Sequence, residues 1–395
     1  MIPPLAGIVV VDLSHAISGP TCTQMLVHLG ADVTKVEPPV KGDDFRHYTE
    51  HAGLPLMSIP FAAINAGKRS ITIDLKTDDG REILSRMIER ADILVENFRP
   101  GVLARLGFPR DRLDALNPRL VSVSISGFGQ HGPLRDWGAY DHIAQAMSGI
   151  AAMNATADGP VKIGMPIVDS FSGYLAVIAV LAALRTRDVT GRGEHVDVAM
   201  FDAALKLIAP SVSVQSYTGD APRSIGNRGY RMVATAEFYP TGHGWIALGA
   251  NHQHQVRKLL DVLGVPDLID DPRFCDHAAR VAHYDEVRGW LIDRLVHEDA
   301  ADLELRLTAA GFPAAMIRDV GEAVTHPHMV ERGLIEDVEL PGFDRPLATV
   351  GAGFLVDRPT TPRRVPTLGW DTENVLADLG YDGDALDRLR AGGAI

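Results

Sequence analysis

Apolar and polar positions follow two different periods along the first two hundred residues. Short apolar or alternating runs, typical of strands, occur at Gly7–Leu13, Asp32–Glu37, Ser70–Leu75, Ile93–Glu96 and Val121–Ser126. Two segments between them have helical character: Pro20–Leu29, which Gly30 ends, and Asp78–Ala91, which has an acidic first turn. Strands that alternate with helices predict an open, mostly parallel α/β sheet.

The pattern changes after residue 210. Ser211–Tyr230 is polar and interrupted by Gly and Pro, which is typical of a linker. Glu237–Tyr239 and Trp245–Gly249 flank a TGHG turn and predict a hairpin, and three helical segments follow, at Gln253–Leu263, Tyr284–Val296 and Ala300–Ala310. Later segments are strand-like at Arg345–Val356 and helical at Asp371–Arg390.

These segments predict two domains, as a chain of 395 residues also favours. A large Rossmann-like α/β domain is expected over residues 1–205, completed by residues 330–395. A smaller α+β domain is expected over residues 230–325, with linkers at 206–229 and 326–345.

Charge is distributed unevenly between the two ends of the chain. Residues 1–110 hold 12 Lys and Arg against 13 Asp and Glu, whereas the remaining residues hold 26 against 38. The overall charge of -13 argues against a protein that coats nucleic acid. An anionic ligand is therefore expected on the N-terminal part.

The expected location is cytoplasmic, with no membrane partner. The N-terminal MIPPLAGIVVVDL lacks the basic start of a signal peptide, and two cysteines make no disulfide framework. The longest apolar stretch, Tyr174–Leu184, has 11 residues, too few to span a bilayer.

Several common catalytic motifs are missing. The first strand leads into DLSHAISGPTCTQ rather than GxGxxG, and no Walker A, HExxH, CxxC or GxSxG motif occurs. His326 and His328 are two residues apart, so on a helix they face different directions. No metal site and no tightly bound cofactor are expected.

The segment Gly164–Arg187 carries the strongest candidate chemistry. Asp169 and Ser170 stand directly before a long apolar helix. On pattern alone either residue is an ordinary helix N-cap. The same position also suits a nucleophile, because the positive end of the helix dipole keeps a carboxylate ionised at pH 7.

The chain resembles the class III CoA-transferase family, which includes formyl-CoA:oxalate and carnitine CoA-transferases. The resemblance spans nearly the whole chain and rests on six blocks in order: VVVDLSHAISGPTCTQMLVHLGADVTKVE, NAGKRSITIDLKT, ILVENFRPGVLARLGF, SISGFGQHGP, GMPIVDSFSGYLAVIAVLAAL and TGRGEHVDVAMFDA. It implies CoA transfer from an acyl-CoA to a free carboxylic acid, with Asp169 as nucleophile. It also implies a homodimer of two interlocked ring-shaped protomers.

The resemblance also implies a set of CoA contacts. The matching positions are His15, Ala16, Ser18, Lys68, Arg69, Leu75, Asn97, Arg105 and Tyr140. Basic side chains suit phosphates and apolar ones suit adenine. Taken singly, Lys68 and Arg69 also fit a solvated strand entry, Arg105 a helix surface and Tyr140 a packed aromatic. Backbone groups beside His15 are candidate oxyanion donors.

Three features separate the chain from related enzymes. The related racemases have a catalytic histidine where this chain has Tyr140, and His142 is expected to point elsewhere. Formyl-CoA:oxalate enzymes have a run of glycines where this chain has Arg223–Arg231, and an amide where it has Ile17. Within that loop Asn227, Arg228 and Arg231 are either acceptor contacts or solvated.

Two alternatives to CoA transfer stay open at this point. One is an acyl-CoA racemase or epimerase of the same superfamily, and the other is a CoA-binding protein without catalysis. The sequence does not specify the donor and acceptor acids, nor whether CoA moves between two molecules or within one diacid.

Overall fold

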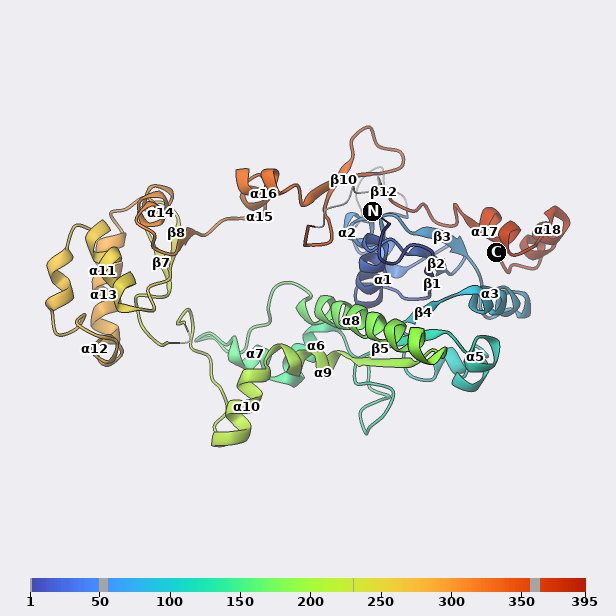
Figure 1. The fold of residues 1–395 in the computed structure, drawn as a ribbon, viewed down its shortest axis with the longest axis horizontal. Coiled ribbons are helices and arrows are strands. Elements are labelled where there is room, and N and C mark those ends of the chain that lie inside the picture. The colour runs from blue at the N-terminus through green and yellow to red at the C-terminus, as the bar shows by residue number, and fades with distance from the viewer. Residues whose placement is uncertain (1, 50–55, 230, 356–362) are drawn as a thin grey trace. The chain divides into compact units, whose positions relative to one another are not determined.

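The computed structural model describes residues 2–49, 56–229, 231–355 and 363–395. The chain forms two compact units (Figure 1). Unit 1 comprises Met1–Ala152, Val161–Pro222 and Val330–Ile395, and unit 2 comprises Met153–Pro160 and Arg223–Met329. One end of the expected linker, Tyr230, and one end of the expected strand, Val356, lie outside the described residues.

Unit 1 is built on a six-stranded sheet with the strand order β3-β2-β1-β4-β5-β6. Every neighbouring pair is parallel, and Val10 of β1 lies between Val33 of β2 and Ile93 of β4. The strands are β1 (Val9–Asp12), β2 (Asp32–Glu37), β3 (Arg69–Thr72), β4 (Ile93–Glu96), β5 (Val121–Ser126) and β6 (His195–Ala199). The expected parallel α/β sheet is confirmed.

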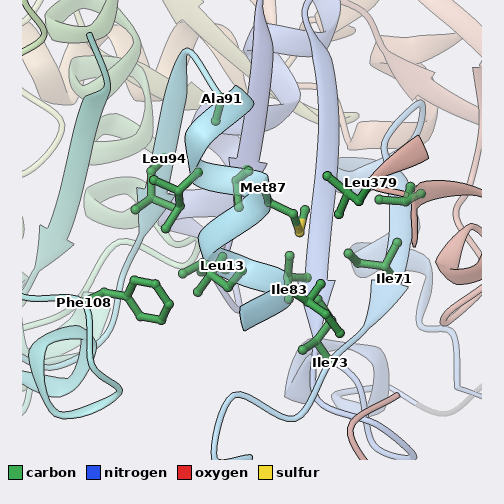
Figure 2. Close-up of a cluster of buried hydrophobic side chains, with 14 of the residues drawn as sticks. Leu13, Ile71, Ile73, Ile83, Met87, Ala91, Leu94, Phe108 and Leu379 are labelled. Atoms are coloured by element: carbon green, nitrogen blue, oxygen red, sulfur yellow. The ribbon is translucent and has the colours of Figure 1, made fainter. Parts of the chain in front are cut away.

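Helices cover both faces of this sheet because side chains alternate along each strand. On one face Val10, Val33 and Val123 pack against α1 (Ser18–His28) and α8 (Ile167–Thr190). On the other face Val11, Leu13 and Ile71 pack against α3 (Asp78–Arg90). Figure 2 shows Leu13, Ile71, Ile83 and Met87 pointing into this second cluster, with Leu379 from the C-terminal segment.

Shorter elements complete unit 1. The helices are α2 (Ile59–Asn65), α4 (Val102–Arg105), α5 (Arg110–Leu116), α6 (Asp141–Ser148), α7 (Ile150–Met153, whose last residue belongs to unit 2), α9 (Met200–Leu207), α10 (Ala209–Thr218), α17 (Thr372–Asp378), α18 (Gly383–Ala391) and a 3-10 helix, η1 (Asp44–His47). A small sheet has the order β11-β10-β12, with β10 (Ile335–Glu339), β11 (Leu347–Val350) and β12 (Arg363–Arg364).

Unit 2 combines a three-stranded antiparallel sheet with helices. The hairpin is confirmed: β7 (Phe238–Pro240) pairs with β8 (Trp245–Leu248), and β9 (Ala314–Met316) adds to the other edge. The remaining elements are α11 (Gln253–Val262), η2 (Pro266–Asp270), α12 (His277–Ala282), α13 (Tyr284–Leu295), α14 (Ala300–Ala309) and α15 (Val320–Val324). Helix α16 (Pro327–Arg332) spans the boundary between the units.

Several boundaries differ from the sequence prediction. The expected linker 206–229 contains α10, because Pro210 stands in its first turn, where proline starts a helix rather than breaking it. The expected return linker 326–345 contains α16 and β10. The C-terminal helix divides into α17 and α18, since Gly380 has a φ of 91°. Strand β6, at the sheet edge, was not predicted.

Helix α8 is longer than the apolar stretch that predicted it. It has 24 residues and satisfies the length and composition of a membrane-crossing helix, so the exclusion based on 11 residues is wrong. Core helices meet the same criteria. Val168, Ala176 and Val180 of α8 are buried, and the helix packs against α1, β5 and β6.

Candidate active site

A cavity of about 630 Å³ opens in unit 1 at the carboxyl ends of β1, β4 and β5. From β1 the sheet continues through β2 and β3 on one side and through β4, β5 and β6 on the other, so the strand order reverses between β1 and β4. Ligands of open parallel sheets bind at this reversal, because the loops after the two central strands diverge there. The cavity is therefore where the fold alone places a ligand site.

Six of the ten predicted site residues line this one cavity. They come from four separate parts of the chain and are His15, Ala16, Ser18, Asn97, Tyr140 and Asp169. The loop after β1 supplies the first three, and Asn97 follows β4 directly. Tyr140 precedes α6, and Asp169 is in the first turn of α8.

The loop after β1 is held by side chains from the segments that follow β2 and β4. Asn97 accepts a hydrogen bond from the His15 amide at 2.8 Å and donates to the His15 carbonyl at 2.7 Å. Asp43 accepts from the amide of Ala16 at 3.0 Å, and Ala16 has a φ of 60°, which is unusual for a residue with a side chain. The amides of His15 and Ala16 thus already donate to side chains, and neither is free to serve as an oxyanion donor in this structure.

Buried ion pairs lie beneath this loop. They are Asp12–Lys68, Lys35–Asp43 and Glu37–Arg46, and all six side chains are fully buried. Burial alone raises the pKa of a carboxyl group, but Lys68 and Lys35 lower the pKa of Asp12 to about 2. Lys35 also donates to the Ser14 carbonyl at 2.6 Å, which ties the charged network to the loop.

Lys68 belongs to this network and not to the cavity. Its ammonium group contacts Asp12 at 3.1 Å, Thr23 at 2.7 Å and Asn65 at 2.8 Å, so its three protons have protein acceptors. The prediction that Lys68 binds a CoA phosphate is therefore wrong for this structure. Burial lowers the pKa of Lys68 to about 8, although Asp12 opposes the shift.

The other predicted CoA contacts lie outside the cavity. Arg69 pairs with Asp32 at 2.7 Å and lines a different cavity of about 600 Å³ together with Arg363 and Trp370. Leu75 is half-buried against the core beneath α3, and Arg105 is exposed on α4. The structure leaves Arg105 accessible to a ligand, but it does not place Arg105 or Leu75 in the cavity with Asp169.

Asp169 is not the N-cap of α8, and neither is Ser170. The helix begins at Ile167, its N-cap is Pro166, and no side chain of its own caps it. Asp141 of α6 does so instead, accepting from the amides of Val168 at 2.7 Å and Asp169 at 3.2 Å. The carboxyl group of Asp169 is therefore not engaged as a cap.

Helix α8 lies unusually close to the loop that holds His15. A Cβ atom at Gly173, one turn after Asp169, would lie 2.6 Å from the Ser18 carbonyl and 2.9 Å from Thr21. Only glycine allows that approach without moving the helix. Gly173 thereby helps to keep Asp169 beside the turn at His15–Ser18.

Asp169 has an ionisation different from the expected one. Burial, reinforced by the Asp141 carboxylate, raises the pKa of Asp169 to about 7. This direction is opposite to the one expected from the helix dipole, which favours the ionised carboxylate. A carboxyl group that titrates near neutrality in a cavity is a typical feature of a catalytic site.

The cavity also contains residues that the sequence did not single out. Besides Asp141, they include the basic Arg99, the acidic Asp44 and two further aromatic side chains, Tyr48 and Trp137. Arg99 reaches Gly138, where an added Cβ atom would lie 3.0 Å from its guanidinium group. Arg99 stands two residues after Asn97 in ENFRPG, and this closeness to a predicted CoA contact could have indicated it from the sequence.

His142 does not point away as expected. Its ring is nearly parallel to that of Tyr140, with the centroids 6.0 Å apart, and both residues line the cavity. This is possible because Tyr140 is the N-cap of α6 and has an extended backbone, so helical spacing does not separate the two rings. Tyr140 is exposed rather than packed.

The loop Arg223–Arg231 belongs to unit 2. Arg228 stacks on the Tyr284 ring at 3.7 Å, and the Tyr284 hydroxyl donates to the buried Glu237 at 2.5 Å. Asn227 and Arg231 are exposed. Across the described ranges, no cluster of three His, Cys, Asp or Glu side chains is suited to a metal ion.

Comparisons with known proteins agree on one family. Residues 5–372 match the model of CoA-transferase family III. The chain is 37% identical over 373 residues to the acetyl-CoA:oxalate CoA-transferase of Acetobacter aceti, covering 91% of this chain and 95% of that protein. It is 36% identical to the succinate–glutarate CoA-transferase of Agrobacterium fabrum, covering 95% and 96%.

A solved structure extends this likeness to the fold. The crystal structure of a CAIB/BAIF family protein from Brucella suis superposes with a TM-score of 0.87 at 32% identity. The superposition covers 96% of this chain and 100% of that protein.

Proposed function

The chain belongs to CoA-transferase family III, and we propose that it transfers CoA between an acyl-CoA and a free carboxylic acid with Asp169 as the covalent nucleophile. The observation that carries this proposal is the position of Asp169. Its carboxyl group does not cap the helix, and Asp169 lines the same cavity as His15 and Asn97. That cavity lies where the sheet reverses its strand order, the usual place for a ligand.

The proposed reaction proceeds through two kinds of covalent intermediate. The ionised Asp169 carboxylate attacks the acyl-CoA carbonyl, which expels the CoA thiolate and leaves a mixed anhydride. The thiolate attacks the aspartyl carbonyl of the anhydride, which forms a β-aspartyl-CoA thioester and releases the donor acid. Each step exchanges one activated acyl bond for another, so no ATP is consumed.

The second half of the reaction reverses these steps on a new acid. The acceptor carboxylate attacks the aspartyl thioester, giving a second mixed anhydride and the CoA thiolate. The thiolate then attacks the acceptor's acyl carbonyl, which yields the new acyl-CoA and restores the Asp169 carboxylate. Acyl-CoA and CoA act here as substrates, and no bound cofactor takes part.

The residues around Asp169 position the reactants in this scheme. The loop at His15–Ser18, held by Asn97 and Asp43, forms one wall of the cavity. Arg99 supplies a positive charge in the same cavity, suited to an anionic part of the CoA ester or the acid. Arg105, exposed on α4, is retained as a candidate phosphate contact.

Replacement of Asp169 by asparagine tests the proposal. The side chain is nearly isosteric, so the fold is retained, but the amide is not a carboxylate nucleophile. We expect transfer of CoA from succinyl-CoA or acetyl-CoA to a panel of free acids to fall by several orders of magnitude. A fully active Asp169→Asn enzyme would contradict the covalent scheme.

The racemase alternative has one observation in its favour, namely His142 in the cavity with Asp169. Two such groups on one cavity suit removal and return of an α-proton. Incubation of a chiral 2-methylacyl-CoA in heavy water distinguishes the two functions. Deuterium uptake without CoA transfer would select the racemase, and CoA transfer without uptake would select the transferase.

We further propose that the native state is an interlocked homodimer in the cytoplasm. The family resemblance motivates the interlocking, and the surface of α8 supports a partner. Tyr174, Ile178 and Leu181 are exposed at helical spacing i, i+4, i+7 and form an outward apolar stripe. Such a stripe is typical of a covered interface.

A further inference from the structure

We propose that Asp141 is a positioning residue that sets the direction of Asp169 and favours its acylated, uncharged states. This inference rests on the function proposed above. Asp141 is the first residue of α6, a different element from the helix that carries the nucleophile. It acts through Asp169 and needs no contact with the substrate.

The geometry gives Asp141 control of the start of α8. One of its oxygens, Oδ2, accepts from both the Val168 and the Asp169 amides, at 2.7 and 3.2 Å. Since Pro166 provides no side-chain cap, Asp141 replaces the missing one. The backbone of the nucleophile is therefore tied directly to this carboxylate.

A second residue fixes Asp141 itself. Its other oxygen, Oδ1, accepts from the Gln145 side chain at 2.5 Å, and Gln145 is fully buried. The side-chain oxygen of Gln145, Oε1, in turn accepts from the Ile163 amide at 2.8 Å. The hydrogen-bonded pair Asp141 and Gln145 thus holds both the first turn of α8 and the segment that leads into it.

The charge of Asp141 acts on the same nucleophile. Burial first, and then the Asp141 carboxylate, raises the pKa of Asp169 to about 7. Acylation converts Asp169 from an anion into a neutral anhydride or thioester and so removes the repulsion between the two side chains. Asp141 therefore shifts the equilibrium between free and acylated enzyme toward the acylated forms.

Other titratable and charged groups line the same cavity as Asp169. The titratable or charged side chains that line the cavity from the neighbouring elements are His15, Asp44, Tyr48, Arg99, Tyr140 and His142. The raised pKa of Asp169 is caused by burial and by the Asp141 carboxylate, and none of these other groups is among its causes. Asp141 differs from all of them because it also bonds the Asp169 amide.

The test is the Asp141→Asn enzyme, which keeps an oxygen acceptor for the α8 amides but loses the charge. Without the neighbouring anion, Asp169 ionises more readily. We expect the acid limb of the kcat/KM profile to move about one pH unit lower, and the fraction of covalent enzyme at steady state to fall. Asp188→Asn, an exposed change near the other end of α8, is the matched control and leaves the limb in place.

A purely structural role gives a different result. Lower activity at every pH with an unmoved acid limb and an unchanged covalent fraction would overturn the proposal. Asp141→Ala, which also removes the cap, separates the two contributions, because it lowers the melting temperature more than Asp141→Asn does.

An activity-free measurement separates this inference from the proposed function. A carboxyl group with a raised folded-state pKa stabilises the fold fully below its unfolded pKa, and this contribution is lost as the pH rises through the folded pKa. Between pH 4 and about 7, wild type should therefore lose stability relative to Asp169→Asn. In the Asp141→Asn background this pH-dependent difference in stability should shrink. If it does not shrink, the proposed effect of the Asp141 charge on Asp169 is wrong, whether or not the enzyme transfers CoA.

Discussion

Asn97 hydrogen-bonds both backbone groups of His15, accepting from its amide at 2.8 Å and donating to its carbonyl at 2.7 Å. The two residues follow β1 and β4, the neighbouring strands between which the sheet reverses its order. One amide side chain thus joins the two loops that frame the cavity.

Asn97→Ala should weaken CoA binding. Two hydrogen bonds to the His15 backbone are lost, so the loop that lines the cavity is held less firmly. We expect a total loss of about 1.4 kcal/mol in binding free energy, which is roughly 10-fold lower affinity by calorimetric titration. Asn117→Ala is the matched control, because Asn117 also bonds two backbone carbonyls, those of Ile88 and Ala91, away from the cavity. It should lower the melting temperature and leave CoA affinity unchanged. Equal affinity in wild type and Asn97→Ala would contradict the role of this contact.

Lys68 and Arg105 should behave differently when each is replaced by alanine. Lys68→Ala leaves the Asp12 charge buried without its partner, so we expect a loss of about 3–5 kcal/mol in the free energy of unfolding. Arg105→Ala changes an exposed side chain, so the melting temperature should stay constant while CoA affinity falls. Urea unfolding and calorimetry measure the two effects. A stable Lys68→Ala protein with reduced CoA affinity would restore Lys68 as a phosphate ligand.

Much of the fold follows from sequence patterning. The runs at Asp32–Glu37, Ile93–Glu96 and Val121–Ser126 became β2, β4 and β5 with the predicted bounds, because short apolar or alternating runs are typical of strands. Strand β6 was not predicted, although HVDVA alternates polar and apolar residues, as is typical of a strand at a sheet edge.

The candidate site was less accessible to sequence reasoning. Asp169 was found through the resemblance, but its cap, Asp141, is 28 residues away in sequence. Lys68 looked like a phosphate ligand because sequence does not show that Asp12 and Thr23 surround its ammonium group. Pairings of this kind depend on tertiary packing, which residue type and spacing do not encode.

The pH profile should report the titration of Asp169. Its deprotonated form is the nucleophile, so kcat/KM should rise with pH and level off above an apparent pKa of about 7. Burial also raises the pKa of Glu96 to about 7, but Glu96 does not line the cavity with Asp169. Glu96→Gln should therefore leave the acid limb where it is. If the acid limb moved in the Glu96→Gln enzyme, the titration would belong to Glu96 and not to Asp169.

Dilution should not dissociate the proposed homodimer. Interlocked protomers separate only by unfolding, so sedimentation velocity over a hundredfold range of concentration should show a single dimeric species. Ile178→Asp, which places a charge in the exposed stripe of α8, should reduce the yield of folded dimer more than Asp188→Asn does. A monomer that appears on dilution would rule out the interlocked arrangement.

The most direct test of the covalent mechanism is to trap the acylated enzyme. Wild-type protein is incubated with acyl-CoA and then with hydroxylamine, which converts an activated aspartyl group into its hydroxamate, a mass increase of about 15 Da. We predict this increase on the peptide that contains Asp169, and its absence in Asp169→Asn and when acyl-CoA is omitted. A label on Asp141, Glu194 or Asp197, or no label on an enzyme that transfers CoA, would contradict the assignment of Asp169 as the nucleophile.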